Sequence, residues 1–116
     1  MREILFRGWT IGEFTWEYGF LSWVDTPRGR GYFINNKRVD ERTVGQYTGI
    51  DDRDGDRIFE GDIFKIGAED NIYTVKFDYG CFLAYEDDVQ VGILAELATM
   101  FIKKIGNIHD NKELIK

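Results

Sequence analysis

The sequence predicts a mostly β protein with very little helix, and three observations support this fold class. Hydrophobic and polar residues alternate over several short segments, turn-forming residues separate these segments, and few segments show helical spacing. Many short strands with frequent turns are typical of a barrel or sandwich-like core. A chain of 116 residues is long enough for one ordinary domain with its own core.

The alternation is clearest from Ile72 to Tyr79. Tyr73, Val75, Phe77 and Tyr79 fall on one face of the expected strand, and polar residues fall on the other. Residues 14–18 show the same pattern. Further strands are expected at residues 4–6, 20–24, 32–34 and 63–66, where aromatic and β-branched residues are frequent.

Turns and helices are predicted from local signals. Residues 27–31 contain proline and two glycines and are expected to interrupt a strand, and Asn35-Asn36 tolerates the left-handed conformation of a tight hairpin. Asp54-Gly55 and residues 68–71 mark two more turns. We expect helix only as one turn at 94–97 and a last turn at 112–115, capped by Asp110 or Asn111.

The charge changes along the chain. The net charge of −6 divides into +1 for residues 1–50 and −7 for residues 51–116. We therefore predict a single domain made of two intimately packed parts, 1–50 and 51–116. An acidic surface helps solubility and repels nucleic-acid phosphates unless a basic patch overrides it.

The sequence also carries signals of cellular location. The single Cys81 cannot form an intramolecular disulfide, which suits a reducing compartment. No run approaches the roughly twenty apolar residues of a membrane span, and Met1-Arg2-Glu3 leads into alternating residues with no signal peptide. We expect a cytoplasmic protein without a membrane partner.

Six acidic residues lie between Gln46 and Asp62, around an Asp-Gly turn. A calcium loop of the EF-hand type requires oxygen ligands at positions 1, 3 and 5, glycine at 6 and glutamate at 12. A frame that starts at Asp52 has Arg57 at position 6 and Ile63 at position 12, and the neighbouring frames lose other ligands. The sequence therefore predicts no metal site in this loop.

A catalytic pair of carboxylates is a second interpretation of the loop. We expect a solvated loop to leave its carboxylates near their ordinary pKa values, which does not favour acid–base chemistry. Glu60-Gly61-Asp62 directly precedes a predicted strand, where carboxylates accept backbone N–H bonds and stabilise a turn. A structural role is thus favoured over chemistry.

The same segment resembles the YopX family of small bacteriophage and prophage proteins. The resemblance rests on Gln46-Tyr47-Thr48-Gly49-Ile50, Asp54-Gly55 and Ile58–Ile63, and it extends to residues 2–9, 75–80 and 105–114. It implies a mostly β fold whose C-terminal part is similar to an SH3-like barrel, here residues 51–116 behind a short-strand N-terminal part. The family is described as uncharacterised in function and brings no catalytic residue. We expect structural roles for the motif residues Gln46, Tyr47, Thr48, Gly49, Gly55, Glu60, Gly61 and Asp62.

Enzymatic and cofactor motifs are not evident. Cys81 and His109 are the only candidates for a thiol–imidazole pair, and Cys81 lies beside Phe82 and Leu83, where a cysteine usually behaves as a small buried hydrophobe. One cysteine and one histidine do not make a structural zinc site. No phosphate-binding or dinucleotide fingerprint is present. We therefore expect no cofactor and no enzymatic activity.

Basic residues gather between positions 28 and 42. Arginine contacts to phosphate and stacking of bases on aromatic rings are how single-stranded nucleic acids are commonly bound. The candidate residues are Arg28, Arg30, Tyr32, Lys37, Arg38 and Arg42. The favoured alternative is a solvated hairpin tip, and in a third interpretation this basic region meets the acidic part of another subunit.

Two function classes remain open from the sequence. The first is a non-enzymatic module that binds a host or phage protein, or itself as a homo-oligomer, in the bacterial cytoplasm. The second is a nucleic-acid-associated protein in phage replication or regulation, acting through residues 28–42. The acidic remainder of the chain favours the first class.

Overall fold

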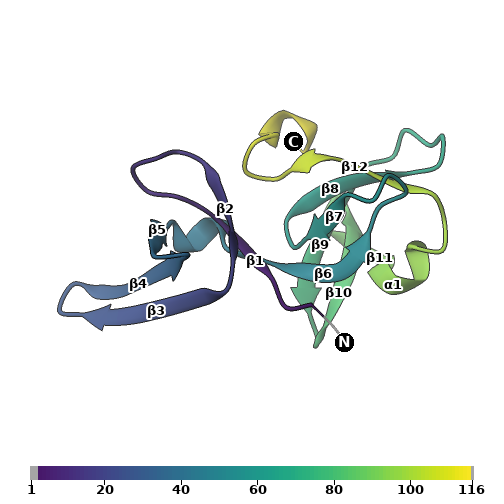
Figure 1. Ribbon diagram of the computed structural model, residues 1–116. Coiled ribbons are helices and arrows are strands. Elements are labelled where there is room, and N and C mark those ends of the chain that lie inside the picture. Colours follow the sequence, from purple (N-terminus) through teal and green to yellow (C-terminus); the bar gives the residue numbers. More distant parts are fainter. Residues whose placement is uncertain (1–2, 116) are drawn as a thin grey trace. The chain divides into compact units, whose positions relative to one another are not determined.

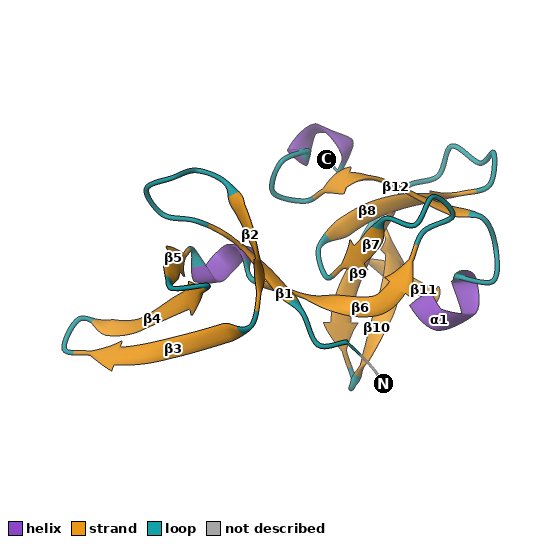
Figure 2. Ribbon diagram, in the orientation of Figure 1, coloured by secondary structure: helices purple, strands orange, loops and turns teal. Residues whose placement is uncertain are grey.

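The computed structural model describes residues 3–115 and confirms a mostly β protein (Figures 1 and 2). The prediction that no signal peptide is present rested in part on Met1 and Arg2, which lie outside the described residues. The chain forms two compact units, Met1–Tyr47 and Thr48–Lys116. Along the chain, the boundary between the units falls within the strand β6 (Gly45–Asp51), and the predicted boundary between residues 50 and 51 falls within the same strand. No helix among the described residues is long and apolar enough to span a membrane.

The first unit contains a three-stranded antiparallel sheet in the order β3-β4-β5 and a pair of strands, β1 and β2. The start of β6 pairs with β1 through Gln46 and Gly45. A short 3-10 turn, Glu41–Thr43, precedes β6. The strands are β1 (Phe6–Trp9), β2 (Trp16–Gly19), β3 (Leu21–Thr26), β4 (Gly29–Ile34) and β5 (Lys37–Val39).

The core of the first unit forms where β1 approaches the three-stranded sheet. Ile34 and Val39 are fully or nearly fully buried there. Val39 forms an isolated bridge with Thr10, and a Cβ atom at Gly8 would lie 2.8 Å from the Cβ of Val39. Gly8 therefore permits a backbone approach that a larger residue would block.

The turns of the first unit confirm one prediction and correct another. Asn35 and Asn36 both have positive φ, 52° and 64°, as a tight hairpin between β4 and β5 requires. The expected interruption at residues 27–31 is wrong in extent, because only Pro27 and Arg28 lie in the turn and β4 already begins at Gly29. Proline initiates this turn, and Gly29, with φ 114°, returns the chain into the sheet.

The second unit is organised around a five-stranded antiparallel sheet in the order β11-β10-β9-β8-β12 (Figure 1). The end of β6 lies beside β7 (Arg57–Phe59). The sheet strands are β8 (Asp62–Ile66), β9 (Tyr73–Asp78), β10 (Cys81–Glu86), β11 (Val89–Ile93) and β12 (Ile102–Asn107). The expected helical turn is present as α1 (Leu94–Leu97), and the last turn, Lys112–Leu114, is a 3-10 turn whose N-cap residue Asn111 makes no side-chain capping bond.

One face of this sheet forms the core of the second unit. Buried side chains from β7 to β12 pack together, with Leu94 of α1 fully buried among them. They are Ile58, Phe64, Tyr73, Val75, Phe82, Ala84, Leu94 and Ile102. Among the described residues the sheet runs from β11 to β12 without closing into a barrel, so a closed barrel is not confirmed.

Three aromatic residues depart from the predicted strand faces. Tyr73 and Val75 are buried as expected, but Phe77 is 47% exposed and Tyr79 is 91% exposed. Tyr79 lies outside β9, in the β9–β10 turn, with φ 54°. Phe14 is likewise in a turn, with φ 59°, and the strand that follows begins only at Trp16. A period-two pattern continues into a turn when the turn residue is itself aromatic, which is why the sequence placed Tyr79 and Phe14 in strands. Phe77 lies within β9 and packs edge-on against Phe82 while remaining partly exposed.

Candidate functional site

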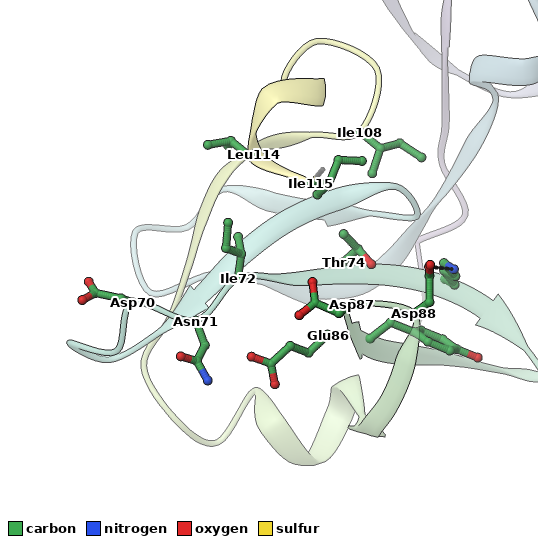
Figure 3. A pocket seen from close by; sticks show the side chains of 12 residues that line it. Asp70, Asn71, Ile72, Thr74, Glu86, Asp87, Asp88, Ile108, Leu114 and Ile115 are labelled. Carbon is green, nitrogen blue, oxygen red and sulfur yellow. Dashed lines mark hydrogen bonds and ion pairs between the residues drawn. The ribbon is translucent and has the colours of Figure 1, made fainter.

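A groove of about 460 Å³ lies in the second unit (Figure 3). Three chain segments line it: the entry and first half of β9, the end of β10 with its hairpin turn, and the C-terminal segment. The lining residues are Asp70, Asn71, Ile72, Thr74, Lys76, Tyr85, Glu86, Asp87, Asp88, Ile108, Leu114 and Ile115. We call this feature the acidic groove.

The register of the β9–β10 pair determines which side chains form the floor of the acidic groove. Tyr85 and Thr74 are directly opposite each other in the β9–β10 pair, so their side chains project from the same face. Because Val75 and Ala84 alternate with them and are buried in the core, Thr74 and Tyr85 face away from that core. Sheet alternation therefore separates the groove face from the core face.

The C-terminal segment is folded into the groove by Asn107, a buried residue at the end of β12. Its side-chain oxygen accepts hydrogen bonds from the backbone N–H groups of His109 and Asp110, both at 2.9 Å. Its own N–H donates to the side-chain oxygen of Asn111 at 3.1 Å. This reversal of the chain brings three aliphatic residues to the groove: Ile108, Leu114 and Ile115.

The groove combines negative charge with apolar surface. Figure 3 shows Ile108 and Ile115 from the C-terminal segment on one side, and Glu86 and Asp87 from the β10–β11 hairpin on the other. Glu86, Asp87, Asp70 and Asp88 give the groove four carboxylates, and the lining contains one cationic residue. That residue, Lys76, lies 3.4 Å from Asp88 and 4.7 Å from the centre of the Tyr85 ring.

Hydrogen bonding orders the aromatic residue of the groove. The Tyr85 hydroxyl donates to a carboxylate oxygen of Asp78 at 2.8 Å. This hydrogen bond, followed by burial and the charge of Asp78, raises the pKa of Tyr85 above its ordinary value. Tyr85 is therefore a neutral donor at physiological pH, and its ring offers Lys76 a face for a cation–π contact.

Two of the six acidic residues of the loop, Asp52 and Asp62, are buried. Asp52 is buried, with its side chain fully covered, and accepts backbone N–H bonds from Asp54 and Asp56 at 2.9 Å and from Lys104 at 3.0 Å. Burial raises its pKa, but these hydrogen bonds and the nearby charge of Lys103 outweigh burial, so the pKa of Asp52 is lowered. The expectation of a uniformly wet loop with ordinary pKa values is thus wrong for Asp52.

Two lysines of β12 form ion pairs with carboxylates of the acidic loop. Lys103 Nζ lies 2.5 Å from Asp54 and 3.7 Å from Asp56. Lys104 Nζ lies 3.1 Å from the buried carboxylate of Asp62. Among the described residues, no group of three or more His, Cys, Asp or Glu side chains is placed so that it could hold a metal ion.

The family-motif residues lie in strands and turns around this loop. Asp62 accepts the N–H of Phe59 at 2.7 Å across a turn that contains Glu60 and Gly61, and Gly61 has φ 92°. Thr48 donates to the carbonyl of Ile58 at 2.8 Å, which ties β6 to β7. Of the remaining motif residues, Gln46 pairs with Phe6 of β1, and Tyr47 is buried. Gly49 and Gly55 have positive φ values of 83° and 85°.

Cys81 and His109 occupy different parts of the second unit. Cys81 begins β10 and is half-buried, with its thiol 3.7 Å from the carbonyl oxygen of Asp78. Cys81 was expected to be a small buried hydrophobe, and this prediction is wrong because the residue is only half-buried. His109 follows β12, and its N–H donates to Asn107. Neither residue lines the acidic groove.

Three of the five basic nucleic-acid candidates are engaged in ion pairs. Arg30 contacts Asp25 at 2.8 Å, and Lys37 contacts Glu13 at 3.1 Å. The Arg42 guanidinium lies 2.8 Å from Asp40. Within the described part of the chain only two of the basic candidates make no ion pair: Arg28, in the β3–β4 turn, and Arg38, on β5.

The basic candidates also share their surface with carboxylates. Arg30, Tyr32 and Arg38 line a shallow depression of about 190 Å³ in the first unit. Asp40 and Glu41 line the same depression. The guanidinium of Arg30 lies 5.1 Å from the centre of the Trp23 ring, so it also contacts an aromatic face. Phosphate binding at this surface would compete with charge pairs already made.

The acidic groove was missed by sequence reasoning. Its lining comes from residues 70–76, 85–88 and 108–115, which only the sheet register and the chain reversal at Asn107 bring together. One local signal was available: Asp87-Asp88 stands between two apolar runs, and both residues have positive φ in a tight hairpin turn.

These features define a class, small mostly β proteins with an open acidic groove, and the comparisons with known proteins give the family. The chain belongs to the YopX family, whose model, described as YopX protein, matches residues 6–116. A crystal structure of protein EF1440 from Enterococcus faecalis is similar in fold, with a TM-score of 0.61, 22% sequence identity and coverage of 100% of both chains. No curated protein matches the chain.

Proposed function

We propose that this protein is a non-enzymatic binding module whose acidic groove receives a basic segment of a host or phage protein. The main support for this proposal is the composition of the groove, which places four carboxylates around aliphatic and aromatic side chains. The one lysine of the groove already contacts Asp88. Charge complementarity favours a cationic occupant and disfavours acidic ones. The aliphatic residues favour apolar side chains between the cationic ones.

The dimensions of the groove fit a short segment. A volume of about 460 Å³ lies within the usual range of ligand pockets and accommodates a few side chains. The open hairpin end carries Asp87 and Asp88, which are both exposed, so that a cationic side chain can approach them from solvent even though Asp88 contacts Lys76. Ile72, Ile108 and Leu114 are half-buried and offer apolar contact below them.

The cellular setting is part of this proposal and follows from the family resemblance. We infer a protein of phage or prophage origin that acts in the cytoplasm of a bacterial host and has no cofactor. The second unit is proposed to serve as an SH3-like module, although its sheet is open. A groove between loops is a common way for small β domains to bind peptides.

A titration of the full chain with two labelled peptides tests the groove. One peptide alternates lysine and leucine, and the matched peptide replaces each lysine with glutamate. Fluorescence anisotropy is expected to show binding of the basic peptide alone, weakening as salt rises. Binding of neither peptide, or equal binding of both, would contradict the proposal.

Matched variants localise the binding. Asp87→Asn combined with Asp88→Asn removes two charges, while asparagine keeps the left-handed turn conformation. We expect affinity for the basic peptide to fall by about 1 kcal/mol, roughly fivefold, the scale of exposed charge pairs. Glu96→Gln, at an exposed position of α1 that does not line the groove, serves as the control and is expected to leave the affinity unchanged.

A further inference from the structure

The strand β3 forms one edge of the three-stranded sheet and offers a regular row of backbone groups. Antiparallel pairs alternate between hydrogen-bonded and non-hydrogen-bonded positions. Thr26 and Gly29 flank the two-residue turn and form a hydrogen-bonded pair, so Val24 and Ser22 also bond toward β4. The N–H and C=O groups of the alternate residues, Leu21, Trp23 and Asp25, therefore point outward, with no partner among residues 3–115.

This edge lacks the features with which proteins usually protect an edge strand. Such strands are commonly shortened, bulged or given lysine or proline. The edge strands β11 and β12 each belong to a pair with a register shift, and β5 is three residues long and contains Lys37. By contrast, β3 is six residues long, pairs with β4 without a shift, and contains neither lysine nor proline.

Three of the six side chains of β3 are apolar, and two of these, Trp23 and Val24, are exposed. Trp23 is 56% exposed and Val24 is 54% exposed, and they lie on opposite faces of the sheet. The single charge of the strand, Asp25, is paired with Arg30 of β4 at 2.8 Å. An incoming strand would therefore meet apolar surface on both faces and no uncompensated charge.

We propose that β3 pairs antiparallel with β3 of a second copy of this chain, with Trp23 on the twofold axis. In this register Trp23 faces Trp23 of the other copy, and Leu21 faces Asp25, so all three outward residues exchange hydrogen bonds. The two three-stranded sheets become one six-stranded sheet with a closed, isologous interface.

The charge pattern selects this register, and the complete pairing of all three outward residues with themselves favours a second copy as the occupant. Centring the axis on Asp25 would place like charges directly opposite each other, which is destabilising. Centring it on Leu21 would leave Asp25 beyond the overlap and lose half of the pairing. Only the Trp23 register uses every outward group and opposes no charges. This interface lies in the first unit and does not depend on the acidic groove.

Charge substitutions at the axis test the proposal with the full chain. Light scattering after size exclusion is expected to give twice the chain mass of 13.6 kDa for the native protein. Trp23→Lys and Trp23→Glu are each expected to give the single mass, because like charges face each other across the axis. An equimolar mixture of the two is expected to restore the double mass. Tyr79→Lys, an exposed aromatic of the second unit, is the control and keeps the native mass.

A native protein that is monomeric at all concentrations would overturn the proposal, as would a Trp23→Lys variant that remains dimeric. A mixture that stays monomeric would overturn the Trp23-centred register.

Hydrogen exchange of the native protein provides a test that needs no variant. On dimer formation the amides of Leu21, Trp23 and Asp25 are expected to gain protection with rising protein concentration, while those of Ser22 and Val24 are protected throughout. Exchange at Trp23 that is fast and independent of concentration would also overturn the pairing.

Discussion

At the scale of single residues, Asp52 shows how a carboxylate in an acidic loop becomes structural. Its two oxygens accept three backbone N–H groups, from Asp54, Asp56 and Lys104, and thereby join the loop to β12. Asparagine at this position would retain the bonds to Asp54 and Asp56 through its oxygen. Its amide nitrogen would then face the N–H of Lys104, placing donor against donor.

We therefore predict that Asp52→Asn lowers the free energy of unfolding by about 1–3 kcal/mol, the usual scale for a buried charged hydrogen-bonding group. Urea denaturation measures this change. Asp54→Asn, at an exposed position of the same loop, is the control and is expected to have a small effect. Equal stability of Asp52→Asn and the native protein would show that these bonds contribute little.

The lowered pKa of Asp52 also predicts a pH dependence. A carboxylate whose folded-state pKa lies below its ordinary value of 3.8 contributes stability that is fully present above that value. This contribution is lost as pH falls through the folded-state pKa. The stability difference between the native protein and Asp52→Asn should therefore be largest above about pH 4 and shrink at lower pH. A difference that grows on acidification would contradict the assignment.

Tyr79 carries conformational strain at the β9–β10 turn. Its φ of 54° is left-handed, and its ring is almost fully exposed, so packing does not compensate. We predict that Tyr79→Asn raises the melting temperature, with a gain of about 0.5–1 kcal/mol, since asparagine tolerates this conformation. The matched Tyr79→Val should lower it, because β-branching disfavours positive φ. Thermal unfolding of the pair checks both directions.

At the scale of elements, the close contact between β1 and β5 depends on Gly8. A Cβ atom there would lie 2.8 Å from the Cβ of Val39, which belongs to the stem of that side chain and cannot move aside cheaply. We predict that Gly8→Ala destabilises the protein by about 1–3 kcal/mol, the usual cost of overpacking. Adding Val39→Ala should recover part of the loss if the contact is the cause. Full stability of Gly8→Ala in denaturant titrations would rule out the close approach.

The strands show what the sequence could predict at this scale. Period-two alternation placed β9, and the Asn35-Asn36 dipeptide predicted the hairpin before β5. Both signals are local, so they need no tertiary information. Aromatic residues in turns, as at Phe14 and Tyr79, extended the apparent strands, and the second tight hairpin at Asp87-Asp88 was not anticipated. Hydrophobicity alone does not distinguish a turn residue from a strand residue.

At the scale of the whole molecule, charge distribution separates the two function classes. The basic candidates Arg30, Lys37 and Arg42 each contact a carboxylate. We predict that labelled single- and double-stranded DNA do not bind at about 50 mM salt, where phosphate contacts should still be strong. Electrophoretic mobility or anisotropy measures this. Binding that is lost on Arg28→Ala or Arg38→Ala would revive the nucleic-acid function.

The candidate site was less predictable than the fold for a physical reason. The motif residues around Asp62 are close in sequence and form local turns, so the sequence could predict that their carboxylates accept backbone N–H bonds. The acidic groove instead joins residues 70–76 to 108–115, and its formation depends on the register of β9 and on the buried side chain of Asn107. Long-range pairings of this kind leave no periodic signal in one sequence.

Chemical-shift mapping of the full chain with the lysine–leucine peptide tests the binding function most directly. Binding in the acidic groove predicts amide shifts concentrated at Thr74, Lys76, Asp87, Asp88 and Ile108, and no such shifts with the glutamate–leucine peptide. Shifts confined to the first unit, or no shifts at saturating basic peptide, would contradict a binding module built on this groove.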